Sequence, residues 1–306
     1  MRLRPLEFVH VMATACLGVA TIAAGVTGWL IEWGVPALCF ASLLLVVALM
    51  IWLAKRELHL SKGMRLVLNF YPVLTIVVVF EALGSLLPAF KWYDGDEPLI
   101  LADRALFGQD PTVWLERFVR PALTDLLYLA YASYHLLPVM LGIVLWKKDE
   151  AIFKQFVFSM TLAFFVNYAG YFLVPAQGPR FALAHRQSVT LEVTPVSQAV
   201  KKTMDLLEHP KLDAFPSAHV MGVVFCLIFS FVRQRRFFYA VLPLGILIII
   251  STIYCRYHYV VDVIGGALLA SILFPVSERL YRRLNAWRGV NGRAETPRPD
   301  LDLQAH

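Results

Sequence analysis

Eight long apolar stretches limit what this chain can fold into. Each holds 18 to 24 residues, and about 20 mostly apolar residues are enough for a helix to cross a bilayer. The stretches lie at 8–31, 36–54, 66–89, 123–146, 153–175, 216–233, 237–254 and 259–278. They predict an all-α, polytopic membrane helix bundle of about eight transmembrane helices. The first stretch is too long for the apolar core of a signal peptide, so we expect it to remain as a span.

The composition excludes two other classes of protein. Hydrophobic residues make up 58% of the 306 residues and charged residues 16%, against about 45–50% and about 25% in a soluble domain. This apolar surplus cannot fit inside one globular core, which excludes a solvated single-domain enzyme and a disordered chain. The net charge of +6 would suggest nucleic acid as the partner of a soluble protein, but here we expect a bilayer and no nucleic acid.

The distribution of basic residues predicts the orientation of the spans. If the N-terminus is cytoplasmic, 18 of the 28 Lys and Arg residues fall in cytoplasmic segments and 10 in outer segments. The outer segments are also the longer ones, so their density of basic residues is lower still. Because cytoplasmic loops are enriched in Lys and Arg, we predict that both termini are cytoplasmic.

Two long segments, 90–122 and 176–214, then lie on the outer side. Within the first, residues 110–118 begin with Asp-Pro and carry Trp and Phe four positions apart. This pattern predicts an amphipathic helix lying on the outer surface. The second segment is basic and polar, which suits a cap over a polar site.

Three short polar motifs fall at the outer ends of predicted spans. They are PAQGPR at 175–180, FPSAH at 215–219 and CRYHYVVD at 255–262. The topology was derived from other residues, yet it places all three motifs on the same side of the membrane. This co-location predicts a polar site at the outer ends of the spans.

The FPSAH motif predicts the start of a helix. Pro216 suits the first helical turn, with Phe215 near the cap position. The N–H groups of Ser217, Ala218 and His219 would then point outward, where the helix dipole adds partial positive charge. Such a start can bind a phosphate-sized anion. An ordinary helix start with an interfacial histidine is the alternative.

The CRYHYVVD motif supplies a histidine and a carboxylate four residues apart. On a helix, His258 and Asp262 would share one face. The carboxylate could accept the Nδ1–H of the imidazole, fix its tautomer and leave Nε2 to attack. Two alternatives are an interfacial ion pair and a zinc site that also uses His219. The four cysteines show no spacing typical of a metal site or a disulfide framework.

Two arginines and several intramembrane polar residues complete the candidate set. Arg180 and Arg256 present planar forks that match phosphate oxygens, although each could instead bind lipid headgroups at the interface. Glu81, in the outer third of its span, and Gln177 are candidates for binding substrate. Helix–helix hydrogen bonding is the alternative for Glu81 and for His135 in the next span.

These motifs resemble a known family. FPSAH followed about forty residues later by HYVVDVIGG is similar to the signature of the type-2 phosphatidic acid phosphatase superfamily, membrane relatives of the vanadium haloperoxidases. RYHYVVDVIGG and ADRALFGQDPTVW resemble more closely its inositol phosphorylceramide synthase branch. The resemblance covers residues 90–275 and is strongest in the last 65 of them.

The resemblance implies roles for individual residues. His258 would be the nucleophile that becomes phosphohistidine, and Asp262 would orient it. His219 would serve as acid and base for the leaving and incoming oxygens, and Arg180 would hold phosphate. With Arg256 and the helix start at Ser217 and Ala218, this set needs neither a metal nor another cofactor.

The sequence departs from the superfamily pattern in the first and last motifs. Leu173 stands where the family has a Lys seven residues before Arg180, and the final Arg-Pro pair is reversed. Ala218 replaces the usual Gly. Thr252 replaces the Arg that lies six residues before the nucleophile, while Arg256 lies two residues before it. The inositol branch shows similar departures.

We therefore expect three regions: transmembrane helices one to three at 1–89, a catalytic membrane domain at 90–288 and a polar, disordered tail at 289–306. The expected activity is phosphotransfer or hydrolysis of a lipid phosphate ester at the outer leaflet, with head-group transfer favoured by the branch resemblance. Hydrolysis by water, as in a lipid phosphate phosphatase, is the first alternative. A transporter or haem-binding membrane protein that uses the histidines is the second.

Overall fold

The computed structural model describes residues 5–27, 34–55, 62–207 and 212–293. Within these residues the chain forms thirteen α-helices, three 3₁₀ helices and no strand. The longer helices are α1 (Pro5–Val26), α2 (Gly34–Lys55), α3 (Lys62–Leu86), α6 (Pro121–Ser133), α7 (Leu136–Lys148), α8 (Glu150–Leu173), α11 (Ala218–Arg233), α12 (Arg235–Tyr254) and α13 (Val260–Arg293). The others are η1 (Leu87–Phe90), α4 (Asp96–Phe107), α5 (Pro111–Trp114), η2 (Leu115–Phe118), α9 (Pro179–Ala182), η3 (Ala184–Arg186) and α10 (Pro195–Leu207).

The long helices confirm a polytopic all-α membrane bundle. Six of the described helices are long and apolar enough to cross a bilayer, and the bent pair α6–α7 adds a seventh span. The remaining predicted span, the sixth stretch at 216–233, forms α11, which has only 16 residues. A helix of that length rises about 24 Å, short of the ~30 Å hydrocarbon core. Its Phe225 and Phe229 are fully buried, so α11 is an inner helix surrounded by α8, α12 and α13.

The fourth predicted span is bent in the middle. The axes of α6 and α7 differ by 47°, with the break at Tyr134 and His135. Pro138 explains the bend, since it has no N–H and its ring crowds the carbonyl four residues earlier, at Tyr134. The bend places Tyr134 and His135 beside His219.

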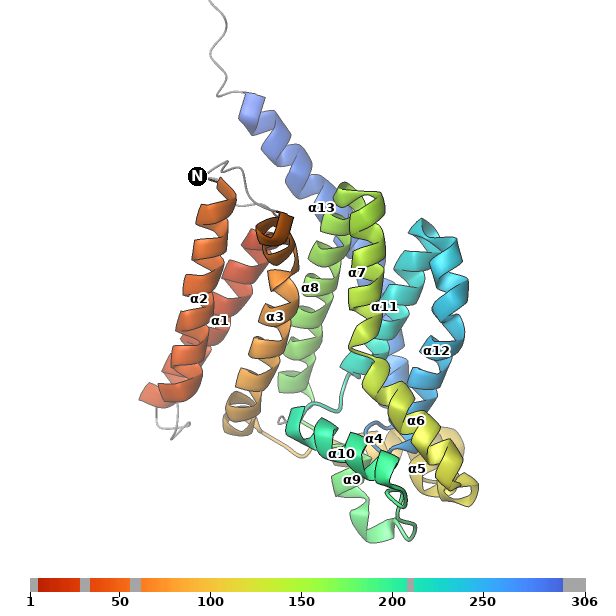
Figure 1. Ribbon diagram of the computed structural model, residues 1–306. Coiled ribbons are helices and arrows are strands. Elements are labelled where there is room, and N and C mark those ends of the chain that lie inside the picture. Colours follow the sequence, from red (N-terminus) through yellow and green to blue (C-terminus); the bar gives the residue numbers. More distant parts are fainter. Residues whose placement is uncertain (1–4, 28–33, 56–61, 208–211, 294–306) are drawn as a thin grey trace, which may run out of the picture.

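The short helices α4, α5, α9 and α10 gather at one end of the bundle (Figure 1). The helix predicted at 110–118 is shorter than expected, because α5 ends at Trp114 and continues as the 3₁₀ helix η2. The Trp114 and Phe118 rings do meet on one face, with centroids 5.1 Å apart. The most regular outer helices are instead α4 and α10.

The C-terminal end also differs from the prediction. α13 continues to Arg293, so residues 289–293, predicted as part of the disordered tail, are helical. The preceding sequence is rich in Arg, Leu and Ala, which favour helix. The rest of the predicted tail lies outside the described residues.

Candidate active site

The three motifs meet at the outer-helix end of the bundle. The His219 and His258 rings lie 5.6 Å apart between centroids. The backbone N–H of Arg180 donates to the carbonyl of Arg256 over 2.9 Å, which joins the first motif to the third. The structure thus brings together segments that are nearly eighty residues apart in the sequence.

The FPSAH segment begins its helix two residues later than predicted. Ser217, not Phe215, is the N-cap of α11, and its hydroxyl accepts the Val220 N–H over 3.2 Å. The Ser217 N–H donates to the carbonyl of Asp262 over 3.2 Å, so this amide is engaged within the protein rather than directed at a ligand. The N–H groups of Ala218 and His219 form the first turn, where anions are favoured.

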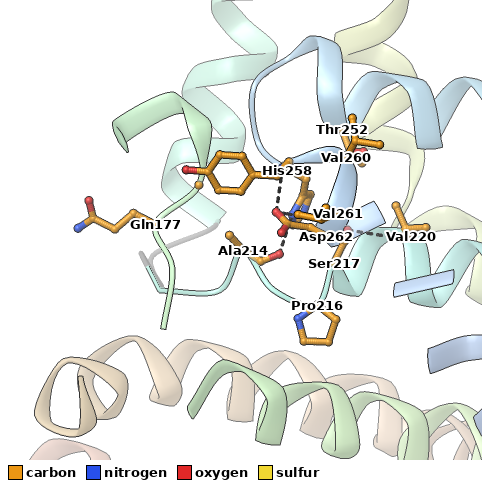
Figure 2. A network of polar contacts seen from close by, with 12 residues as sticks. Gln177, Ala214, Pro216, Ser217, Val220, Thr252, His258, Val260, Val261 and Asp262 are labelled. Carbon is orange, nitrogen blue, oxygen red and sulfur yellow. Dashed lines mark hydrogen bonds and ion pairs between the residues drawn. The ribbon is translucent and has the colours of Figure 1, made fainter. Parts of the chain in front are cut away.

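The nucleophile candidate is held by one of its ring nitrogens. Nδ1 of His258 lies 2.9 Å from the carbonyl oxygen of Ala214 and 3.5 Å from Oδ2 of Asp262 (Figure 2). Ala214 is therefore the closer acceptor, and the expected direct hydrogen bond to Asp262 is a longer ion-pair contact. His258 also precedes α13, which begins at Val260, so the predicted shared helix face is wrong. With its proton on Nδ1, the imidazole carries its lone pair on Nε2.

Asp262 ties the end of α13 to its surroundings. Its Oδ2 accepts the N–H of Tyr259 over 2.8 Å, and its side chain is fully buried. Close behind it, Gly266 packs so tightly that a Cβ there would lie 2.5 Å from the carbonyl oxygen of Ser217. The Gly-Gly pair after Asp262 therefore allows α13 to approach the FPSAH segment.

The side chain of Arg180 points into a polar cavity of about 440 Å³. Its guanidinium lies 4.6 Å above the ring centroid of Tyr257 and contacts Asp205 over 3.1 Å. Asp205 and Lys201, both on α10, also line this cavity. The second outer segment therefore covers a polar site, as its composition predicted.

Arg256 is more deeply engaged. Its Nη2 contacts Oε1 of Glu116 over 2.8 Å and the carbonyl of Val189 over 2.7 Å, and its Nη1 contacts Gln187 over 3.2 Å. Its backbone adopts the left-handed region with φ 66°. A carboxylate therefore occupies the fork of Arg256 that the sequence suggested for phosphate, although the residue still lines the polar cavity.

Aromatic rings separate the polar cavity from His219. Tyr131 stacks on Tyr257 with centroids 4.2 Å apart and on His219 with centroids 4.6 Å apart. Tyr134 contacts the same histidine at 4.4 Å. These rings fix the plane of the imidazole.

A second cavity, of about 220 Å³, lies on the other side of His219 and is mostly apolar. His219 and Ala218 line it at the start of α11, and the lining also includes the carboxylates Glu81 and Asp213 and a second histidine, His135. The remaining lining residues come largely from α3 and α8, with Pro138 from α7.

The other candidates are placed as follows. Gln177 is exposed and lines neither of these cavities; its backbone N–H donates to Asp96 over 2.7 Å. In addition, Asn167, a buried polar residue of α8, donates to the carbonyl of Pro216 over 3.2 Å, which anchors the FPSAH loop. Among the described residues, no group of three or more His, Cys, Asp and Glu side chains is arranged to hold a metal ion.

Two buried carboxylates on α4 were not recognised from the sequence. Asp96 accepts three hydrogen bonds and Asp103 accepts two, all from the segments that carry the motifs. Burial raises the pKa of Asp103 above its ordinary value, against the opposite effect of its two amide donors. Burial, followed by the nearby Asp96, raises the pKa of Tyr259. Helical periodicity signals one face of α4 but does not show which loops that face contacts.

Comparisons with known proteins identify the family. Residues 97–276, more than half of the chain, match a family model described as PAP2 superfamily. A PA-phosphatase related-family protein of Dictyostelium discoideum is 24% identical over 203 residues. The matched region covers 60% of this chain and 36% of that relative, so the chain spans well under half of the relative's length. No solved structure matches significantly.

Proposed function

This chain belongs to the PAP2 superfamily, and from that premise we propose that it processes a lipid phosphate ester through a phosphohistidine intermediate. The superfamily comprises phosphatases and phosphotransferases, which favours an enzyme over the transporter or haem protein that the histidines alone left open. The pairing of His219 with His258 at 5.6 Å is the observation that carries the proposal.

The proposed reaction has two steps. Nε2 of His258 attacks phosphorus, the ester P–O bond breaks, and His219 gives its proton to the leaving oxygen. An acceptor hydroxyl then attacks phosphorus, His219 takes its proton, and the P–N bond breaks. The Ala214 carbonyl and Asp262 stabilise the positive imidazole in between, because both face Nδ1. Arg180 and the first-turn amides at Ala218 hold the phosphate oxygens.

Two features support access from within the bilayer. The apolar cavity joins the catalytic His219 to the membrane-spanning helices α3 and α7, whose outward positions Leu74 and Leu136 are 69% and 58% exposed. The 16-residue length of α11, short of the hydrocarbon core, also supports a position for His219 below the membrane surface. We therefore propose that the lipid chain occupies the apolar cavity, with Glu81 near its head group. The basic-residue distribution supports an extracytoplasmic position for this end of the bundle.

Head-group transfer is favoured over simple hydrolysis by the polar cavity. That cavity carries both signs of charge, including Arg180, Lys201 and Glu192, and it is large enough for a polyhydroxylated acceptor. An inositol-phosphorylceramide-synthase-like transfer fits this surface. Water as acceptor would give a lipid phosphate phosphatase with the same catalytic residues.

The test uses the full chain in detergent micelles or liposomes with labelled lipid phosphates. Release of inorganic phosphate is measured against formation of a new phosphodiester, with and without added sugar alcohols. The His258→Ala variant should lose both products and the acid-labile phosphoenzyme. His185→Ala, an exposed histidine on η3, serves as the matched control and should keep full activity. Turnover that persists in His258→Ala would refute the proposed nucleophile.

A further inference from the structure

Helix α4 contacts both loops that frame the candidate active site. Its carboxylates Asp96 and Asp103 lie seven residues apart, two turns along the same face. Both are almost completely buried, at 4% and 1% exposed. Burying two carboxylates is costly unless each is well hydrogen-bonded, and their partners come from outside α4.

Asp96 accepts hydrogen bonds from the first motif and from the residue next to the proposed nucleophile. Its Oδ2 accepts the Gln177 N–H over 2.7 Å, and its Oδ1 accepts the Gly178 N–H over 2.8 Å and the Tyr259 hydroxyl over 2.9 Å. Gly178 has φ 90°, and a Cβ there would lie 2.7 Å from the carbonyl oxygen of Tyr257. The loop therefore fits tightly between α4 and the third motif.

A chain of hydrogen bonds connects this loop to the imidazole of the proposed nucleophile. The carbonyl of Ala176, beside the amides that donate to Asp96, accepts the Ala214 N–H over 3.1 Å. The carbonyl of Ala214 in turn lies 2.9 Å from Nδ1 of His258. A displacement of the 176–178 loop would therefore move the group that fixes the tautomer of His258.

Asp103 caps the helix that follows the nucleophile. Its Oδ2 accepts the Val260 N–H over 3.0 Å, and its Oδ1 accepts the Val261 N–H over 2.9 Å. These are the first two amides of α13, which have no partner within their own helix. A carboxylate here also complements the helix dipole, and it fixes the backbone two residues after His258.

We propose that Asp96 and Asp103 are positioning residues, through which α4 braces His258 and the Arg180 loop in reactive geometry. They act through other residues and do not touch the phosphate. This inference rests on the proposed function, because the geometry to be preserved is that of phosphoryl transfer. An error of about 1 Å in such a geometry can cost about 100-fold in rate.

The first measurement is independent of the reaction. Hydrogen exchange of the peptide 255–263 is compared among wild type, Asp103→Asn and Asp110→Asn. Asp110 is the matched control, since it is a buried carboxylate on the same outer side that forms ion pairs with Arg104 and Arg186. We expect faster exchange in Asp103→Asn alone. Unchanged exchange in that variant would refute the proposal that Asp103 holds the backbone after His258, even if the protein proved to have another activity.

The second measurement is kcat and KM for a labelled lipid phosphate, normalised to folded protein. Asp103→Asn and Asp96→Asn should lower kcat 10- to 100-fold and leave KM within about twofold, while Asp103→Glu should recover part of the loss. Tyr259→Phe, which removes a single hydroxyl, should lower kcat only a few-fold and should fold normally. Faster exchange with unchanged kcat would overturn the positioning role. A wild-type protein that is inactive on all lipid phosphates would refute the proposed function. The exchange result would still test whether Asp103 holds the backbone after His258.

Discussion

Among the residues that the structure describes, two regions bury a histidine, and only one of them has the features of a catalytic site. His10 on α1 is fully buried against α3 and α8, with Nδ1 3.0 Å from the Leu6 carbonyl and Nε2 2.7 Å from the Thr75 hydroxyl. His258 is also buried, and its Nδ1 also faces a backbone carbonyl. Burial and a fixed Nδ1 are therefore shared by both histidines and do not distinguish chemistry from packing.

The difference lies in what surrounds the rest of the ring. The second nitrogen of His10 meets a hydroxyl on a neighbouring span, and both nitrogens are satisfied within the helix bundle. The ring of His258 instead lies near a second imidazole, His219, which can carry a proton. The start of α11 and Arg180 lie at the same end. A buried histidine in a membrane protein becomes a functional candidate through such neighbours.

Among the substitutions that test the difference between the two buried histidines, we expect the largest loss of activity at His219. His219→Gln should lower kcat by about 10²–10⁴-fold, because both the leaving oxygen and the acceptor lose their proton carrier. With an aryl phosphate, whose leaving group needs no proton, the first step should be affected less and phosphohistidine should accumulate. Burst-phase kinetics measure both steps. An equal loss on both substrates without accumulation would contradict the acid–base role.

Arg180 and Arg256 differ in the same way: we expect Arg180 to bind phosphate and Arg256 to stabilise the fold. Arg180→Ala should lower kcat/KM about 10- to 100-fold, as expected for losing a charge-assisted bond to phosphate. Arg256→Gln should mainly lower thermal stability, because Glu116, whose side chain is 9% exposed, keeps a buried charge without its partner.

A double-mutant cycle provides the control for this pair. Adding Glu116→Gln to Arg256→Gln should recover part of the lost stability, measured by thermal inactivation in detergent. Recovery of stability with kcat/KM near wild type would leave Arg180 as the main phosphate ligand. A loss of kcat/KM in Arg256→Gln as large as in Arg180→Ala, without a stability change, would contradict this division.

The sequence predicted the bundle and the meeting of the three motifs because both depend on local signals. Apolar length defines a span, and the spacing of motifs along spans defines which end they occupy. The bend at Tyr134 also had a local signal in Pro138, but the length of the apolar stretch outweighed it. At FPSAH two local preferences competed, Pro at the first helical position and Ser at the cap, and the serine cap is the one that formed.

The contributions of α4 could not be predicted in the same way. Asp96 accepts a hydrogen bond from an amide more than eighty residues away in the chain, and Asp103 from one more than one hundred and fifty residues away. No periodicity links a carboxylate to a distant helix start. The partner of Arg256 has the same character, since Glu116 lies 140 residues earlier. Tertiary capping and ion pairing of this kind require the fold.

The smallest expected effect concerns the histidine of the N-terminal helices. His10→Phe removes two hydrogen bonds inside the bundle, and such bonds within membranes contribute on the order of 1 kcal/mol each. We therefore expect faster thermal inactivation but a specific activity per folded molecule within twofold of wild type. Val19→Phe is the control, because the Val19 side chain on α1 is 67% exposed. This substitution should change neither the rate of thermal inactivation nor the specific activity. If His10→Phe lost activity like His258→Ala at unchanged stability, the N-terminal polar contact would belong to the catalytic machinery, and the contrast between the two buried histidines would fail.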